Sequence, residues 1–578
     1  MILLPPNLQW KQNNQSNVLG NIWSSFNLDL SSNLGRLRIS PRLLVQTTTD
    51  EDMTTAPCAF RFYSSKFWTI SGTKVHSNSG VLESDFSADA TAGFPTNCRF
   101  DYSDMELFNG WLYVTTDSNS IYKYNGSAWA NYAIGASSVG PHMLTVYAGK
   151  LYYTTLVNTI RPLTAAGTFA DADTIGTAFT LGAASDVISN ITWLRSASNR
   201  IWIGTLSERV GKSFIYEWDG VSTQATRSYR IEAQGALACV IKDDIPWVMD
   251  SNGQLLVFNG ATFKEVARLP IENIYLKNAV DPRNTRFIHP NGMSVIDGKI
   301  NLLINNENED NGATINENLP SGIWEYDENI GLYHKHSLSY YNDFSGAITD
   351  YGQNRISVAG ALSELKLVNS ASNANGTLMA GALYFTDATA TQARVFIDDR
   401  NDTIQKSGYF VTSWIDSQNV QDIWQSIITT YRQLLDSADK IILKYRTTEA
   451  DPTEISITWV DTDTFTTATD VSGKVGYEVE IVQGTGSGKT AHISSVTGAS
   501  PYTVNLDDTF TGVTTGTAKA RLQAWTKLGE ITGQTQEWSK FPIGKKSPRI
   551  QVKCCIISTG KNEIHRLALI NQPHQLLT

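Results

Sequence analysis

The chain has 578 residues, of which 41% are hydrophobic and 18% are charged, and its formal net charge is −10. This length predicts two to four domains with packed cores. The acidic balance and the lack of a long basic run argue against strong nucleic-acid binding by counterion release. No run of 18 apolar residues occurs, so we expect no membrane-spanning segment. Five scattered cysteines do not suggest a disulfide framework and fit synthesis in a reducing cytoplasm.

Residues 1–55 form an N-terminal segment that we expect to add the strand closing the next domain, or to dock elsewhere. Its first residues, MILLPPNLQWKQ, are not expected to be a secretory signal, because the apolar run is short and stops at Pro5 and Pro6.

Short aromatic strands recur over residues 56–405, at steps of roughly 40–56 residues. A unit of four strands with this spacing is the size of a propeller blade. We therefore predict an all-β fold with a β-propeller of about seven blades; six or eight blades, and a large irregular β-sandwich, remain alternatives. The strands that mark the repeat begin at or contain Trp68, Trp111, Leu151, Trp202, Trp247, Ile300 and Ile356.

A second strand in most repeats ends at Asn-Gly or Asp-Gly, as in YNGSAW (124–129) and FNGATF (258–263). These dipeptides favour hairpins, because both central residues of a type I′ turn need positive φ. Each repeat is thus predicted to run strand, turn, strand, Asn/Asp-Gly turn, strand.

Residues 406–448 and 521–578 predict a C-terminal β-sandwich, and residues 449–520 predict a small β-module inserted into it. The segment DIWQSIITTYRQLL (422–435) has apolar residues at helical spacing but also a β-branched run, which favours a strand ending in one helical turn. Cys554 and Cys555 are neighbours in a predicted strand, so their side chains should point to opposite faces and should not form a disulfide with each other.

The stretch GTGSGKT (484–490) inside the predicted module looks like a phosphate-binding loop. The pattern G-x-x-x-x-G-K-[ST] requires its first glycine at position 483, which is Gln483. The loop also needs a helix after it, whereas residues 490–508 alternate apolar and polar residues and contain Gly498 and Pro501. We therefore interpret it as a hairpin loop and predict that it binds no nucleotide.

The C-terminal strands ILKYRTT, LGEI, FPIGKKSPRIQVKCCIIST and IHRLAL, preceded by loose Y-N-G repeats, resemble virion proteins of tailed bacteriophages. The likeness covers residues 400–578 by motif and 60–400 by architecture, and it includes propeller tail proteins of nozzle or hub type. The resemblance implies a non-enzymatic tail component that forms a homo-oligomeric ring around the DNA-ejection channel, made in the host cytoplasm and residing in the virion. Implied partners are copies of itself and adaptor and fibre proteins, with DNA passing transiently; residues 1–55 would then dock on the tail. The alternative is a receptor- or glycan-binding propeller, or one that cleaves glycans.

Three groups of polar residues are candidate sites. His334 and His336 share one face of a predicted strand and could ligate a metal with a third ligand, although a polar strand face is the commoner explanation. The acidic loop 305–317 and the pair Asp461 and Asp463 lack the spacing of a calcium loop and are interpreted as solvated turns. We therefore predict no catalytic, cofactor-binding or metal-binding residues and no cofactor.

Overall fold

The computed structural model describes the strands and most of the turns that connect them. The described residues are 2–3, 11–12, 21–30, 36–45, 53–78, 86–100, 103–117, 120–133, 142–156, 158–181, 189–207, 213–269, 287–305, 321–336, 356–365, 377–385, 391–399, 406–417, 423–432, 439–448, 453–486, 489–510, 512–513, 515–533, 536–558 and 563–572. Within them the chain is β-structure apart from one 3-10 turn, Ser472–Lys474, which confirms the all-β prediction.

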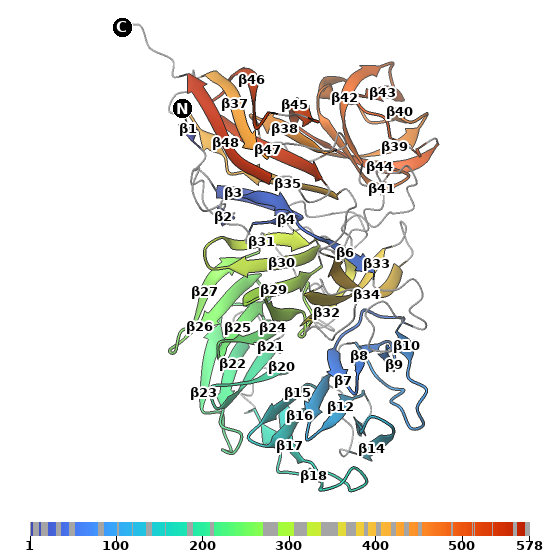
Figure 1. Ribbon diagram of the computed structural model, residues 1–578, viewed down its shortest axis with the longest axis vertical. Coiled ribbons are helices and arrows are strands. Elements are labelled where there is room, and N and C mark those ends of the chain that lie inside the picture. The colour runs from blue at the N-terminus through green and yellow to red at the C-terminus, as the bar shows by residue number, and fades with distance from the viewer. Residues whose placement is uncertain are drawn as a thin grey trace.

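Seven small antiparallel sheets follow one another along the described chain between residues 60 and 399 (Figure 1). Sheet 1 comprises β7 (Phe60–Tyr63), β8 (Lys66–Ser71), β9 (Lys74–Ser77) and β10 (Ser87–Ala88). Sheet 2 comprises β11 (Met105–Phe108), β12 (Trp111–Thr115), β13 (Ser120–Tyr124) and β14 (Trp129–Ala133). Sheet 3 comprises β15 (Leu144–Tyr147), β16 (Lys150–Leu156), β17 (Thr159–Thr164), β18 (Thr174–Ile175) and β19 (Phe179–Thr180). Sheets 4 and 5 comprise β20 (Ser189–Ala197), β21 (Arg200–Ser207), β22 (Ser213–Trp218) and β23 (Arg227–Ile231); and β24 (Ala236–Lys242), β25 (Ile245–Asp250), β26 (Gln254–Phe258) and β27 (Phe263–Arg268). Sheets 6 and 7 comprise β28 (Met293–Ile296), β29 (Lys299–Ile304), β30 (Gly322–Asp327) and β31 (Gly331–His336); and β32 (Ile356–Glu364), β33 (Leu378–Phe385), β34 (Thr391–Asp399) and β6 (Arg42–Val45).

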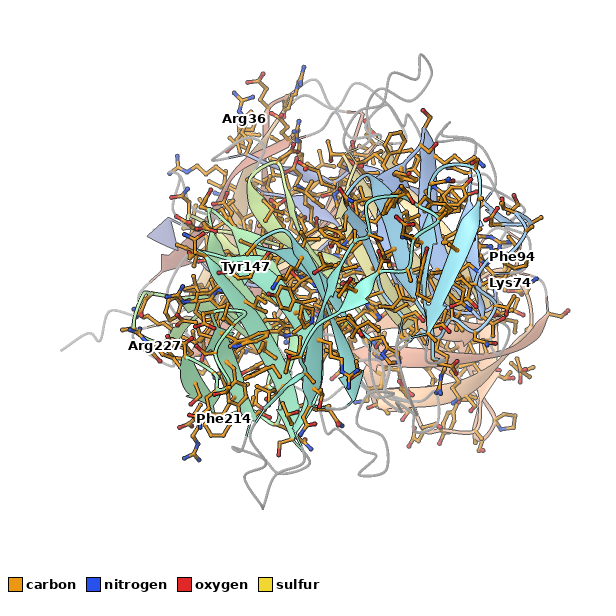
Figure 2. All side chains as sticks on the ribbon, turned by 90° about the horizontal axis from the view of Figure 1, so that it is seen from below. Arg36, Lys74, Phe94, Tyr147, Phe214 and Arg227 are labelled. Carbon is orange, nitrogen blue, oxygen red and sulfur yellow. The ribbon has the colours of Figure 1, made fainter. Side chains whose placement is uncertain are left out.

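These sheets are arranged in a ring. The first strand of each sheet contacts the first strand of the next, and β32 of sheet 7 contacts β7 of sheet 1. Each neighbouring pair of sheets shares a buried apolar cluster, including the pair formed by sheets 7 and 1. Lys74 of sheet 1 and Arg227 of sheet 4 accordingly lie on opposite sides of the molecule in Figure 2. This radial arrangement is of the β-propeller type, in which each sheet buries its faces against its neighbours.

The repeated aromatic segments correspond to one strand position in six of these sheets. Six of the marker residues lie on the second strand of their sheet, as Trp68 does on β8 and Trp202 on β21. The seventh marker is displaced, because Ile356 begins β32, the first strand of sheet 7. The alignment of that repeat was therefore wrong by one strand.

The turn chemistry also differs from the prediction. Tight two-residue turns with positive φ at both positions join the first and second strands, as at Asn109-Gly110 and Asp243-Asp244. The Asn-Gly hairpins between the third and fourth strands are instead four-residue loops, in which only the glycine has positive φ. In them the Asn125 side-chain oxygen accepts hydrogen bonds from the backbone N–H groups of residues 127 and 128, at 2.9 Å each. Asn is therefore selected there for its side-chain acceptor rather than for left-handed backbone.

The N-terminal segment contributes to two parts of the fold. Strand β6 pairs antiparallel with β34, so sheet 7 combines residues from the beginning and from the far end of the ring (Figure 1). The side chain of Leu43 on β6 is fully buried between sheets 6 and 7. Strands before β6 do not belong to the ring; they pair with C-terminal strands, a long-range pairing that the sequence pattern had not indicated.

Two larger sheets lie beside the ring. Sheet A contains β1 (Ile2–Leu3), β4 (Leu28–Asp29), β5 (Leu37–Ile39), β48 (Glu563–Gln572), β37 (Ile423–Tyr431) and β46 (Trp538–Lys546). Sheet B contains β2 (Lys11–Gln12), β3 (Asn21–Phe26), β35 (Lys406–Thr412), β47 (Arg549–Ser558), β38 (Lys440–Arg446), β45 (Thr526–Thr532) and β36 (Ile415–Asp416). The segment with the ambiguous pattern is thus a strand, β37, and the helical turn predicted after it lies outside the described residues.

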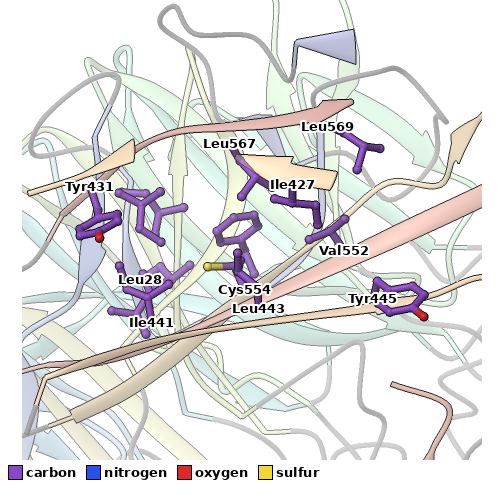
Figure 3. Packing of buried hydrophobic residues seen from close by; sticks show 14 of the residues in the cluster. Leu28, Ile427, Tyr431, Ile441, Leu443, Tyr445, Val552, Cys554, Leu567 and Leu569 are labelled. Carbon is purple, nitrogen blue, oxygen red and sulfur yellow. The ribbon is translucent and has the colours of Figure 1, made fainter. Parts of the chain in front are cut away.

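One apolar core joins sheets A and B (Figure 3). It contains Leu28, Ile427 and Leu567 from sheet A and Leu443, Val552 and Cys554 from sheet B. Cys554 points into this core, whereas Cys555 is only partly buried, and both are free thiols as predicted. Ile330 and Tyr333, beside and on β31, belong to the same core, so the ring packs directly against the two sheets.

A closed six-stranded barrel is inserted between β38 and β45. Its strands, in barrel order, are β39 (Thr453–Trp459), β40 (Thr464–Thr467), β43 (Tyr502–Leu506), β42 (Thr490–Thr497), β41 (Glu478–Gly484) and β44 (Gly516–Gln523). The barrel has its own apolar core, which includes Trp459, Phe465 and Val504. The last strand of the barrel, β44, ends at Gln523, slightly beyond residue 520, where the inserted module was expected to end.

Candidate functional site

An axial cavity of about 210 Å³ lies among the first strands of the ring. Side chains from six of the seven sheets line it, because the first strands are the ones that meet around the axis. Its polar lining comprises Arg61, Glu106, Thr145, Arg195, Asn291, Ser294 and Ser363.

Arg61 on β7 and Glu106 on β11 form an ion pair across the boundary between sheets 1 and 2. Arg61 Nη2 donates to Glu106 Oε2 at 2.8 Å, and Nη1 donates to the carbonyl of Phe60 at 2.8 Å. Burial by itself would lower the pKa of Arg61, but the carboxylates of Glu106 and Asp104 outweigh it and raise that pKa. The guanidinium is therefore a permanent positive charge at the cavity wall.

Arg195 on β20 provides the second guanidinium of the lining. Its Nε donates to the carbonyl of Cys239 at 3.2 Å, and its Nη2 donates to Asn291 Oδ1 at 2.8 Å. These bonds hold the side chain against sheet 5 and against the segment that precedes sheet 6.

Asn291 closes a polar network near the axis. Its side-chain Nδ2 donates to the backbone carbonyl of Cys58 at 3.0 Å and to Asp104 Oδ1 at 3.1 Å. The backbone carbonyl of Asn291 accepts from Leu362 N at 2.8 Å. Together with Arg195, this one residue links sheet 4, the entries to sheets 1 and 2, and sheet 7. The network connects the first strands around the cavity.

Sequence reasoning missed the two arginines, although a signal was present. Arg61 is directly opposite the marker Trp68 in the strand register, and Arg195 is directly opposite the marker Trp202. Both arginines therefore occupy the same position of the repeat. Aligning the repeats on their tryptophans would have placed two basic residues on the axis-facing strands.

His334 and His336 are both buried, but each already has a backbone partner. His334 Nδ1 accepts from Asn27 N at 2.9 Å and its Nε2 donates to the carbonyl of Ser321 at 3.0 Å; His336 Nδ1 donates to the carbonyl of Pro41 at 2.9 Å. Both histidines thus attach the N-terminal segment to sheet 6. The described residues include no group of three or more His, Cys, Asp or Glu that could hold a metal ion.

We expect this histidine attachment to weaken in acid. Burial lowers the pKa of His334 from 6.5 to about 3 and that of His336 to about 4, and for His336 the neighbouring Lys335 adds to the effect. Between these values and pH 6.5 the unfolded chain binds more protons than the folded chain, so stability is full above pH 6.5 and falls as pH decreases. For His334 the loss is about 5 kcal/mol once the pH is below 3, and about 3 kcal/mol of it falls between pH 6.5 and pH 4. Urea unfolding from pH 7 to 4 should show this slope, and the slope should be smaller in His334→Gln. The matched variant His565→Gln, at a side chain that is 41% exposed, should retain it; an equal slope in all three proteins would contradict the assignment.

The GTGSGKT stretch forms the hairpin between β41 and β42, as the sequence predicted. Gly484 and Gly486 have positive φ, Lys489 N donates to the carbonyl of Gly486 at 3.1 Å, and a strand rather than a helix follows. Lys489 lies 5.8 Å from the ring centre of Phe510.

Nucleotide binding at this hairpin is therefore not expected. Replacement Lys489→Ala should leave the protein unchanged in a fluorescent-ATP titration, because wild type and variant should both fail to bind. Micromolar binding by the wild type that is lost in the variant would contradict the hairpin assignment.

The remaining candidates behave as turns or lie outside the described residues. Asp461 Oδ1 accepts from Asp463 N at 3.0 Å, which lowers the pKa of Asp461 and caps the turn between β39 and β40. Residues 306–317 of the acidic loop lie outside the described residues. No helix in the described chain has the length and apolarity needed to cross a bilayer.

Comparison with known proteins does not assign this chain to a family. No protein-family model matches the chain, and no curated protein is detectably similar to it. Among solved structures, Saccharomyces cerevisiae Sqt1 covers 65% of this chain and 97% of its own at 12% identity, with a TM-score of 0.35. YCF48 from Cyanidioschyzon merolae covers 60% of this chain and 96% of its own at 10% identity, with a TM-score of 0.34, and the computationally designed Ika8 protein covers 61% and 99% at 12% identity, with a TM-score of 0.32. These scores are too low to carry an argument, so the propeller-type assignment rests on the strand pairing and on the clusters between sheets.

Proposed function

We propose that this protein is a structural component of a bacteriophage tail, of nozzle or hub type, in which copies form a ring around the DNA-ejection channel. In this proposal the ring of sheets is a seven-bladed propeller, and sheets A and B form a β-sandwich that carries the barrel. Its partners are copies of itself and adaptor and fibre proteins, it performs no catalysis, and it resides in the virion.

The arrangement of the C-terminal strands is the observation that supports the proposal best. The segments that resemble tail proteins are β38, β45 and β47, together with β46 and β48 of sheet A. The first three are direct neighbours in sheet B, in the order β47-β38-β45, and β48 faces them across the shared core. Motifs scattered over more than a hundred residues therefore build one structural unit, as expected if the resemblance reflects a common architecture.

Strand β46 offers a surface for contacts between copies. It lies at the edge of sheet A, its inward residues Phe541 and Ile543 pack on the shared core, and Trp538 is 54% exposed. Exposed tryptophans are enriched at interfaces, and cyclic symmetry lets one surface pair serve every contact in a ring.

Cryo-electron microscopy of intact particles tests the proposal. The expected result is this chain in several symmetry-related copies around the tail axis. A monomer away from the axis would favour the receptor- or glycan-binding alternative, and absence from particles would end the structural proposal.

A second test concerns the contacts between copies. Trp538→Glu should reduce the assembled fraction measured by analytical ultracentrifugation, because it places a charge in the contact. Val221→Glu is the matched control, since Val221 is 84% exposed in the loop between β22 and β23, two strands that lie away from sheet A in Figure 1. Equal assembly by both variants would show that β46 is not part of the contact between copies.

A further inference from the structure

We infer that the axial cavity binds a small hydroxylated carboxylate, of the class of hexuronic acids. The site lies within one chain, so this inference is independent of the tail proposal and of any assembly.

Free hydrogen-bond donors are the first argument. A guanidinium has five N–H donors in a planar fork that matches a carboxylate. Hydrogen bonds with other described residues occupy two donors of Arg61 and four of Arg195. Both side chains line the cavity, and their remaining donors, most of them on Arg61, are what a carboxylate would use.

The charge of the lining selects for one negative charge. Arg61 and Arg195 face a single lining carboxylate, Glu106, which leaves an excess of one positive charge. The nearby Asp104 carboxylate is not part of the lining and accepts from Asn291 Nδ2 and from the backbone N–H groups of Met105 and Leu144. Its charge also acts on Arg61 and so reduces this excess. A monoanion balances this excess, whereas a dianion such as phosphate would be repelled by Glu106.

The rest of the lining suits a hydroxylated molecule. Thr145 and Ser294 line the cavity, and their hydroxyls make no hydrogen bond with another described residue. Thr145 is buried, at 5% exposure, so its hydroxyl gains most from a ligand partner. The surface of the lining is mainly polar, which suits a ligand that carries several hydroxyl groups. A volume of about 210 Å³ equals roughly seven water molecules, which is the scale of one monosaccharide.

Titration calorimetry with the purified chain tests this site. Glucuronate should bind saturably, while glucose and inorganic phosphate should each bind at least about tenfold more weakly, since the first lacks the carboxylate and the second carries excess charge. Arg61→Met should weaken glucuronate binding by about tenfold or more, because it removes the fork and leaves Glu106 unbalanced.

Two further variants decide the location. Ser294→Phe fills the cavity and leaves both arginines in place, so it should also abolish binding. Arg200→Met is the matched control, because Arg200 pairs with Glu217 at 3.1 Å on sheet 4, outside the cavity lining, and it should bind glucuronate as the wild type does. Absence of glucuronate binding up to tens of millimolar, binding retained in Ser294→Phe, or phosphate bound as tightly as glucuronate would each overturn the inference.

Discussion

Replacing Glu478 with Gln should strongly destabilise the junction between the barrel and sheet B. Glu478 on β41 accepts from Lys444 Nζ and from Lys553 Nζ, both at 2.9 Å, and all three side chains are at most 9% exposed. Burial would raise the pKa of Glu478, but the two lysines outweigh it and hold that pKa well below its usual range. Without the carboxylate, two buried ammonium groups face each other uncompensated. We expect a loss of about 3–5 kcal/mol, measured by urea unfolding.

Glu480 provides the control for this prediction. It lies on the same strand and pairs with Arg521 at 3.6 Å, but its side chain is 33% exposed. Glu480→Gln should therefore cost less than about 1 kcal/mol. Similar losses in the two variants would mean that the buried triad has no special role.

Replacing Lys123 with Met should destabilise the ring between sheets 2 and 3. The Lys123 side chain is fully buried; its Nζ lies 3.2 Å from Asp173 Oδ1 and 4.3 Å and 4.5 Å from the ring centres of Trp111 and Tyr132. Methionine keeps the apolar stem but leaves the buried Asp173 carboxylate without its cation. We expect a loss of about 3–5 kcal/mol in the unfolding free energy of the ring.

Two further proteins test the cause of that loss. The double variant Lys123→Met with Asp173→Asn should recover part of the stability, because it removes the uncompensated charge. Lys242→Met is the matched control, since Lys242 also lies near a tryptophan, Trp247, at 5.8 Å, but pairs with a largely exposed Glu328. It should cost under about 1 kcal/mol; a loss as large as that of Lys123→Met would assign the effect to lost packing.

The local elements could be read from the sequence because their signals are local. Trp68, Trp202 and the other regular markers lie on strands whose alternation and flanking turns are within a few residues of them. The same holds for the GTGSGKT hairpin, where Gln483 and the alternation after Thr490 excluded a P-loop. The displaced marker Ile356 shows the limit. QNRISVAG at this marker shares the Asn-Arg-Ile pattern of SNRIWIGT at Trp202, yet Ile356 begins the first strand of its sheet and Trp202 lies on the second strand of its own.

The candidate site could be predicted only in part. The repeat places Arg61 and Arg195 at equivalent positions, and this much is contained in the sequence. Asn291 lies between repeats, and nothing near it indicates that it bridges Arg195, Cys58 and Asp104. The cavity exists only because strands far apart in the chain meet around one axis.

By itself, the sequence determined the all-β character, the recurring strands and the inserted module, because side-chain alternation and turn residues act over short distances. Only the tertiary structure decided that β6 completes sheet 7 and that β3 and β5 join C-terminal strands. It also decided that His334 and His336 attach the N-terminal segment to sheet 6. Backbone hydrogen bonds between strands are the same for any pair, so their partners are selected by which apolar faces can be buried together, and that selection belongs to the whole fold.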